Sequence, residues 1–550
     1  MKFIKVFINS VISGVFFCSL LSLLIYDLNI NKIFNLSTFT HLTLFLSIVY
    51  GAIITLVCII LFFILQFILG KNFKISFISA SFLILSFSLL LILFLIIFKT
   101  NYNFFLSFFN FEIQNLLRRQ FLFLIGITLT GILFFYLIYV HKKSAVLLIT
   151  YFILFFSGMA YIVLQRVNYP VFQEKEGVAF LEPKEIDKKI TIIGLEGLSF
   201  DFIIPLTSEG KLPNLSWLME EGGWGKLESF SPNEPLTLNN SFNSGKFPSK
   251  HHRLSIYEYH MLNIDEEFEI VPRFILFRQL MRTKLLNATP NQSPIKTKDI
   301  WKIFEENQTK CLIKDWPYQR KIKKPSPKTE TLFNQFFKDF KYETSDIFNN
   351  VKQAFYNDCE FEENAMQENN KTQPQILYFL LNGLNIVESF FYKYSFPDLF
   401  GYMDQEEINK FNKVIEKYYQ FYDQIIGKYL ASLKEDELLI VYSPHGTEAL
   451  PLYKRLIEWM LGNVDISAYH DNAPEGVVFF YGKEVDRGKN IEGIRLIDIC
   501  PSLLYYLGLH VGKDMDGIAK TSIFTKNFRA ENPVSFIFSY DEITIKKKNK

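Results

Sequence analysis

The hydrophobic positions divide the chain into two parts with different patterns. In the first part, five apolar stretches are each long enough to cross a bilayer, which takes ~20 residues of helix. These stretches are Val6–Tyr26, Leu42–Leu69, Ile75–Phe98, Phe121–Val140 and Ala145–Leu164. The first stretch is not followed by a small-residue cleavage site, so we interpret it as a retained helix rather than a signal peptide. The sequence therefore predicts five transmembrane helices.

From residue 189 onward, short apolar runs alternate with helical segments. The clearest runs are Lys189–Ile193, Ile376–Leu381, Leu438–Tyr442 and Val477–Tyr481. They are continuously apolar rather than alternating, which is typical of strands buried on both faces. Helices are predicted between them, for example over Asp404–Leu433 and Asp498–Leu507. The predicted fold class is an α/β domain with a mostly parallel central sheet and helices on both faces.

These patterns also set the predicted boundaries along the chain of 550 residues. The four predicted parts are a membrane domain (1–166), a linker (167–188), an extracytoplasmic α/β domain (189–530) and a basic C-terminal tail (531–550). The linker contains Pro170 and Pro183, which interrupt any regular element there.

Charge and cysteine content exclude two classes of protein. Residues 1–166 contain eleven Lys and Arg against two acidic residues, which leaves 47 basic against 54 acidic residues in the rest. Because nucleic-acid binding needs a basic soluble domain, the acidic balance of the second part excludes a nucleic-acid partner. Five cysteines without a CxxC pair argue against a disulfide framework and a structural zinc site.

Lysines near the apolar stretches predict the orientation of the helices. Three pairs fall on one side of the membrane: Lys2 and Lys5, Lys71 and Lys74, and Lys142 and Lys143. Since Lys and Arg concentrate in cytoplasmic loops, we predict a cytoplasmic N-terminus and an extracytoplasmic location for residues 167–550. The segment 99–119, which ends in Arg118 and Arg119, fits either an amphipathic interfacial segment or a plain connecting loop.

The spans contain no charged residue at mid-depth, where an ion or proton path would need one. A transporter is therefore disfavoured. We interpret the helices as an anchor in the lipid bilayer, or as a platform for a substrate with a lipid-linked phosphate head group.

Two side chains with metal-binding capacity follow predicted strands. Glu196 comes directly after the first strand in a Gly-Leu-Glu-Gly turn, and His445 follows the third strand within Ser-Pro-His-Gly. In open α/β sheets the functional residues lie at the carboxyl ends of the strands. A capping acid and a loop histidine would explain the same two residues without any function.

The α/β part carries several motifs in a fixed order. They are IIGLEGLSFDF, LPNL, SGKFPSKHH, TKDIWKIFEENQTKCLIKDWP, LLIVYSPHG and AYHDNAPEGVVFFYGKEV. Together they resemble the type I phosphodiesterase/nucleotide pyrophosphatase branch of the alkaline phosphatase superfamily. The resemblance covers roughly residues 189–520. It implies the α/β fold of that superfamily and a site with two divalent metals, a Thr or Ser nucleophile, and six Asp or His ligands.

The resemblance assigns a role to each candidate residue. Glu196 stands where the family has a metal-binding Asp, and His445 and His470 match two metal-binding histidines. Gap-free alignment places Pro235 at the nucleophile position, and Thr237 is the nearest hydroxyl. Thr237 can serve as the nucleophile only after a two-residue shift of the loop.

Three expected metal ligands are replaced. Asn385 and Ser389 stand in place of an Asp and a His, and Pro444 stands in place of a second Asp. Glu388 is next to the lost His position, but one helical residue turns a side chain by about 100°. We therefore expect Glu388 to be a solvated acid rather than a ligand.

Two interpretations of the site stay open. In the first, the chain is a catalytically degenerate member of the family that binds no metal and acts as a binding or scaffold protein of the cell envelope, with envelope proteins as partners. In the second, it is a metal-dependent phosphodiesterase or head-group transferase with Zn²⁺ or Mn²⁺ bound by Glu196 and His445 and with Thr237 as nucleophile. Bound metal would separate the two interpretations.

Overall fold

Contacts within a computed structural model divide the chain into two units that do not follow the order of the sequence. The first unit comprises Met1–Glu174 and Phe247–Lys296, and the second comprises Lys175–Lys246 and Thr297–Lys550. A segment inside the predicted α/β domain thus groups with the apolar helices. The structure describes residues 2–68, 80–140, 145–169, 179–273, 277–291, 297–314, 325–338, 340, 346–460, 463–470 and 473–545.

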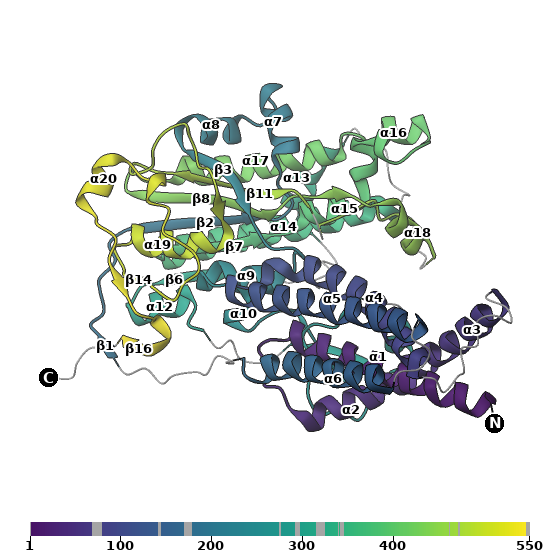
Figure 1. The fold of residues 1–550 in the computed structure, drawn as a ribbon. Coiled ribbons are helices and arrows are strands. Elements are labelled where there is room, and N and C mark those ends of the chain that lie inside the picture. The colour runs from purple at the N-terminus through teal and green to yellow at the C-terminus, as the bar shows by residue number, and fades with distance from the viewer. Residues whose placement is uncertain are drawn as a thin grey trace. The chain divides into compact units, whose positions relative to one another are not determined.

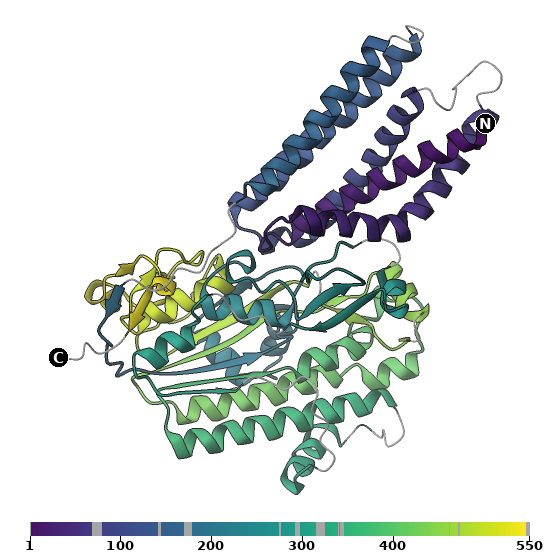
Figure 2. The same ribbon diagram turned by 90° about the horizontal axis from the view of Figure 1, so that it is seen from below.

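The first unit is dominated by long apolar helices (Figures 1 and 2). They are α1 (Lys2–Leu28), α2 (Leu36–Leu46), which runs through a π-helical turn (Ser47–Gly51) into α3 (Ala52–Ile68), α4 (Ala80–Phe105), α5 (Phe111–Val140) and α6 (Ala145–Val167). Five stretches are long and apolar enough to cross a membrane: Phe7–Leu28, Leu36–Ile64, Leu83–Phe108, Phe111–Ile138 and Ala145–Val167. The prediction of five membrane helices is confirmed.

Two boundaries of the predicted spans differ from the structure. Residues 99–119 are mostly helical, because α4 continues to Phe105, a 3-10 turn covers Leu106–Phe108, and α5 begins at Phe111. The expected loop or interfacial segment is therefore the end of one helix and the start of the next. The predicted start of the third span, Ile75, lies outside the described residues.

The segment that groups with the helices is attached to them by polar contacts. It contains the antiparallel strands β4 (Tyr257–Met261) and β5 (Leu286–Pro290), and the helices α10 (Pro248–His251) and α11 (Phe277–Arg282). The Asn29 amide, just after α1, accepts from the backbone N–H groups of Glu269 and Ile270, each at 2.9 Å, and donates to the Ile270 carbonyl. Tyr26 donates to the Glu266 carboxylate at 2.7 Å. These contacts explain the grouping of segments far apart in sequence.

A sheet of eight strands organises the second unit. Its order is β12 (Lys489–Asn490), β3 (Gly223–Glu228), β11 (Glu475–Tyr481), β8 (Glu437–His445), β2 (Lys189–Leu195), β7 (Ile376–Leu381) and β6 (Cys311–Lys314), with β13 (Ile494–Arg495) also paired to β3. All four predicted strands are present. Neighbours are parallel except that β11 is antiparallel to both β3 and β8. The predicted mostly parallel sheet is confirmed.

Helices cover both faces of this sheet (Figure 1). One face packs against α7 (Phe200–Ser208), α8 (Pro213–Glu221), α13 (Pro327–Phe337), α14 (Asp346–Thr372), α15 (Gly383–Ser395), α16 (Gln405–Phe411) and α17 (Val414–Ser432), which share one large hydrophobic core with it. The predicted helix over 404–433 is thus two helices, α16 and α17. The other face is covered by α9 (Pro235–Ser244), α12 (Ile300–Glu306) and α19 (Ile499–Tyr506), where the Phe242 ring stacks on Tyr442 at 4.7 Å between ring centroids.

Smaller elements complete the second unit. They are β1 (Ala179–Leu181), β9 (Glu448–Ala449), α18 (Leu452–Met460), β10 (Ala468–Tyr469), β14 (Val511–Gly512), α20 (Lys526–Glu531), β15 (Phe536–Ile537) and β16 (Ile543–Ile545). Strand β16 pairs in parallel with β1, so the expected tail contains ordered structure up to residue 545.

Candidate functional site

The carboxyl ends of β2 and β8 bring two candidate residues to one edge of the sheet. The strands are parallel neighbours, with Gly194 opposite Tyr442. Glu196 follows β2, and His445 is the last residue of β8. The turn is fixed by Gly197, whose N–H donates to the Ser443 hydroxyl at 3.1 Å and whose φ of 100° favours glycine.

His470 reaches the same edge from β10. Its ring stacks on the ring of His445 with 4.8 Å between centroids and 22° between planes. His445 is buried, and its Nδ1 lies 3.0 Å from the Gly446 carbonyl oxygen. Burial, and after it the proximity of His470, lower the pKa of His445 to about 3. At neutral pH His445 therefore carries no charge.

A small pocket adjoins this edge on the α9 face of the sheet. Glu196, Pro235 and Pro444 line it together with apolar and aromatic side chains. Its volume is about 10 Å³, close to the ~10–15 Å³ that one water molecule needs.

Thr237 does not face this pocket. The lining residues from α9 are Pro235, Leu238, Asn239 and Phe242. Thr237 lies two residues after Pro235, about 200° around the helix axis. Its side chain is completely buried, and its hydroxyl has no hydrogen-bond partner among the described residues. The pocket is thus lined by a proline, not a hydroxyl, at the aligned nucleophile position.

The first turns of α15 carry the two substituted ligand positions. Asn385 donates from its amide to the side chain of Asn382 at 3.0 Å. The Ser389 hydroxyl donates to the Asn385 carbonyl oxygen at 2.9 Å, one helical turn back. Both side chains therefore make local helix contacts, as Ser and Asn commonly do.

The expectation that Glu388 is solvated is wrong. Its side chain is completely buried, and its carboxyl accepts from the hydroxyls of Thr447, in a short hydrogen bond, and Tyr419, at 3.3 Å. A Cβ at Gly197 would lie 2.7 Å from Glu388 Oε2, so the carboxyl packs against the glycine turn. Burial raises the pKa of Glu388 to about 8. At neutral pH the residue is therefore mostly protonated and uncharged.

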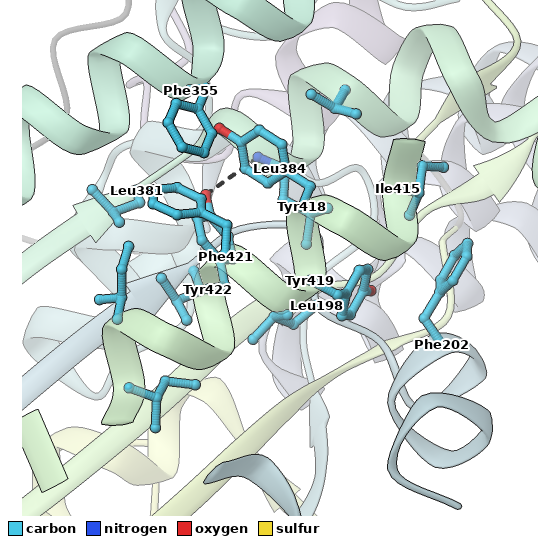
Figure 3. Close-up of a cluster of buried hydrophobic side chains, with 14 of the residues drawn as sticks. Leu198, Phe202, Phe355, Leu381, Leu384, Ile415, Tyr418, Tyr419, Phe421 and Tyr422 are labelled. Atoms are coloured by element: carbon cyan, nitrogen blue, oxygen red, sulfur yellow. Dashed lines mark hydrogen bonds between the residues drawn. The ribbon is translucent and has the colours of Figure 1, made fainter. Parts of the chain in front are cut away.

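The start of α15 is positioned by a buried carboxylate that sequence reasoning missed. Asp358 on α14 accepts from the Gly383 N–H at 3.1 Å and from the hydroxyls of Tyr418 and Tyr422, each at 2.8 Å. Tyr422 also accepts from the Leu384 N–H (Figure 3). These contacts hold the helix that carries Asn385 and Glu388. No local motif marks Asp358, because its partners are 25 to 64 residues away.

The donor set at this edge does not fit a catalytic metal. A catalytic zinc takes about three protein ligands and an open position. The described residues contain no group of three or more His, Cys, Asp or Glu side chains that could hold a metal ion. Pro444 has no side-chain donor, and the Glu388 carboxyl is already occupied by the hydroxyls of Thr447 and Tyr419. The prediction that Glu196, His445 and His470 bind a metal stays untested.

Comparison with known proteins identifies the class of the second unit. The model of the family "type I phosphodiesterase / nucleotide pyrophosphatase" matches residues 190–495, more than half of the chain. The chain belongs to this family, within the alkaline phosphatase superfamily, and it is anchored by apolar membrane helices.

The comparison with solved structures and with curated proteins gives the following. The structure of murine ectonucleotide pyrophosphatase/phosphodiesterase 5, an inactive variant in complex with AMP, is similar with 11% sequence identity and a TM-score of 0.35. The similarity covers 62% of this chain and 100% of that one. A search of the curated proteins finds no match.

Proposed function

We propose that this chain is a catalytically degenerate member of the type I phosphodiesterase family. It acts as a binding or scaffold protein of the cell envelope, with its phosphodiesterase-like domain outside the cytoplasm. The observation that carries the proposal is the donor chemistry at the carboxyl ends of β2 and β8, where neutral side chains replace the metal-binding carboxylates.

The loss of charge supports this proposal most strongly. Two dications in one site need several carboxylates, because the ions are the largest local charges. Here Asn385 and Pro444 are neutral, the Glu388 carboxyl accepts from two buried hydroxyls, and His445 is paired face to face with His470. Glu196 is the one carboxylate that lines the pocket in the described part of the chain.

The described lining of the pocket contains no serine or threonine, the family's nucleophile types, and this is a second, independent support. A nucleophile must reach the phosphorus atom and lie within hydrogen-bond distance of a base or next to a metal. Pro235 has no hydroxyl, and Thr237 is completely buried on another side of α9. Restoring one metal ligand would not supply a nucleophile.

The extracytoplasmic location rests on the lysine pattern. The three lysine pairs lie near the N-terminus, between the second and third spans, and between the fourth and fifth spans. If these positions are cytoplasmic, an odd number of crossings puts the second unit on the opposite side. A periplasmic or exterior reporter fused after Lys550 should be active, and a cytoplasmic reporter at the same place should be silent.

Hydrolysis by the purified full-length protein tests the catalytic part of the proposal. With added Zn²⁺ or Mn²⁺, we expect phosphomonoesters and phosphodiesters to be hydrolysed at the rate of the protein-free control. Turnover that disappears in Thr237→Ala would contradict the proposal and establish the single-metal enzyme. The matched control is Thr207→Ala, which changes a threonine on α7 that is not part of the site.

A further inference from the structure

Helix α18 (Leu452–Met460) lies in the segment of the chain that connects His445 to His470, the two stacked histidines. Strands β9 and β10 pair antiparallel on either side of it, and the Leu450 N–H donates to the Ser467 carbonyl at 2.9 Å. The Ser467 N–H donates in turn to the carbonyl of Ser389 on α15. The two ends of this segment are therefore paired with each other and tied to α15.

Four apolar side chains of α18 face outward. Leu452 is 66% exposed, Leu456 54%, Trp459 65% and Met460 69%. Their spacing of i, i+4, i+7 and i+8 places them on one stripe of the helix. Val464, shortly after the helix, is 63% exposed and adds to the same apolar surface. A water-exposed helix normally turns such a stripe toward the core.

The polar side chains of α18 face inward and are held by specific contacts. Glu458 is buried and accepts from the Tyr469 hydroxyl at 3.0 Å and from the Asn463 amide at 2.8 Å. Arg455 donates to the carbonyl oxygens of Leu399 and Phe400 and lies over the Phe400 ring. The outward direction of the apolar stripe is thus fixed by the bonding of the opposite face.

We propose that the apolar stripe of α18 lies in the head-group region of the membrane that anchors the chain. A helix of this kind buries its apolar face about 5–10 Å into the boundary between head groups and acyl chains. Trp459 and Tyr453 are residue types enriched at that boundary. The proposal does not depend on whether the neighbouring site is catalytic.

A lipid surface fits this stripe better than a second protein for two reasons. The five membrane helices keep the domain permanently at a bilayer, so contact costs little additional loss of freedom. The residues of the stripe itself are all apolar, so contact with lipid removes no charged group from water. The single acid, Glu458, is buried away from the surface.

Tryptophan quenching tests the proposal in the full-length protein. The chain contains five tryptophans, of which Trp217 on α8 is also exposed, at 47%. The protein is reconstituted into phosphatidylcholine vesicles whose acyl chains carry bromine near the head group. We expect bromine quenching of the wild-type emission, loss of most of this quenching in Trp459→Phe, and its retention in the matched control Trp217→Phe.

A second variant replaces one apolar side chain of the stripe with a charged one and keeps Trp459. Leu456→Asp should reduce the bromine quenching of Trp459 without unfolding the domain, because this side chain is exposed. Equal quenching in Trp459→Phe and wild type would overturn the proposal. So would a Trp459 that is quenched by aqueous iodide instead of bromine, or by neither, the last result indicating that a protein surface covers the stripe.

Discussion

Two buried clusters of titratable side chains in the second unit differ in whether groups of opposite charge lie next to each other. In the first, the Lys246 ammonium, after α9, lies 2.6 Å from carboxylate oxygens of both Asp514 and Asp541. In the second, beside the ends of β2 and β8, Glu388 and His445 are buried, and their hydrogen-bond partners are two hydroxyls and a backbone carbonyl. In the first cluster one ammonium therefore lies against two carboxylates, and the second cluster has no such pair of opposite charges.

The comparison shows how a protein core tolerates titratable groups. Burying a charge is costly unless an opposite charge and hydrogen bonds compensate it, and otherwise the group shifts its pKa and becomes neutral. The pKa of Glu388 is raised to about 8 and that of His445 is lowered to about 3, so both have become neutral. A metal would be the compensating charge that the second cluster lacks.

The largest expected effect is in the charged cluster. Lys246→Met leaves two carboxylates without their ammonium, and we expect a loss of about 3–5 kcal/mol in the free energy of unfolding. Thermal unfolding of the full-length protein in detergent measures it. The matched control is Lys226→Met, whose ammonium is mostly exposed and 3.6 Å from Glu475, and which should cost at most about 1 kcal/mol. Equal effects of the two variants would contradict the comparison.

A smaller effect is expected at Glu388. Glu388→Ala removes the acceptor of two buried hydroxyls and should cost about 1–3 kcal/mol at pH 7, whereas Glu388→Gln, which resembles the protonated acid, should cost much less. The folded state holds this proton up to about pH 8, and the unfolded state loses it near 4.5. Stability should therefore fall as pH rises between these values in the wild type, and this slope should be absent in Glu388→Gln. Equal slopes would show that Glu388 is ionised.

The effect that is smallest near neutral pH concerns His445 and has the opposite sign. Its folded pKa is about 3 and its ordinary value is 6.5, so below pH 6.5 the unfolded state binds a proton that the folded state excludes. Stability should fall by about 1 kcal/mol for each pH unit below this value. His445→Asn should remove that part of the pH dependence, as measured by thermal unfolding. The control is the same substitution at His260, a partly exposed histidine outside the site.

Long apolar patterns made much of the fold predictable from the sequence. The membrane spans and the strands at 189, 376, 438 and 477 follow from continuous hydrophobic runs. The grouping of Phe247–Lys296 with the membrane helices was not predictable, because it depends on contacts such as Asn29 with Ile270, 241 residues apart.

The candidate site was predictable only in part, for a similar reason. The strand-end position of Glu196 and His445 follows from the general rule for α/β sheets. The burial of Glu388 does not, because Asp358, Tyr418 and Tyr422 fix the start of α15, and those residues come from other helices. Likewise, the pattern of α18 reveals two faces, but only the contacts of Arg455 and Glu458 decide which face points outward.

Titration of the full-length protein with Zn²⁺ at pH 7, followed by calorimetry, tests the central claim most directly. The account predicts no stoichiometric site, because Asn385, Ser389 and Pro444 supply none of the donors that the resemblance assigns to their positions. Saturable binding of one or two Zn²⁺ ions per chain that is lost in both Glu196→Ala and His445→Ala would contradict it. That result would show that the strand-end site still holds a metal.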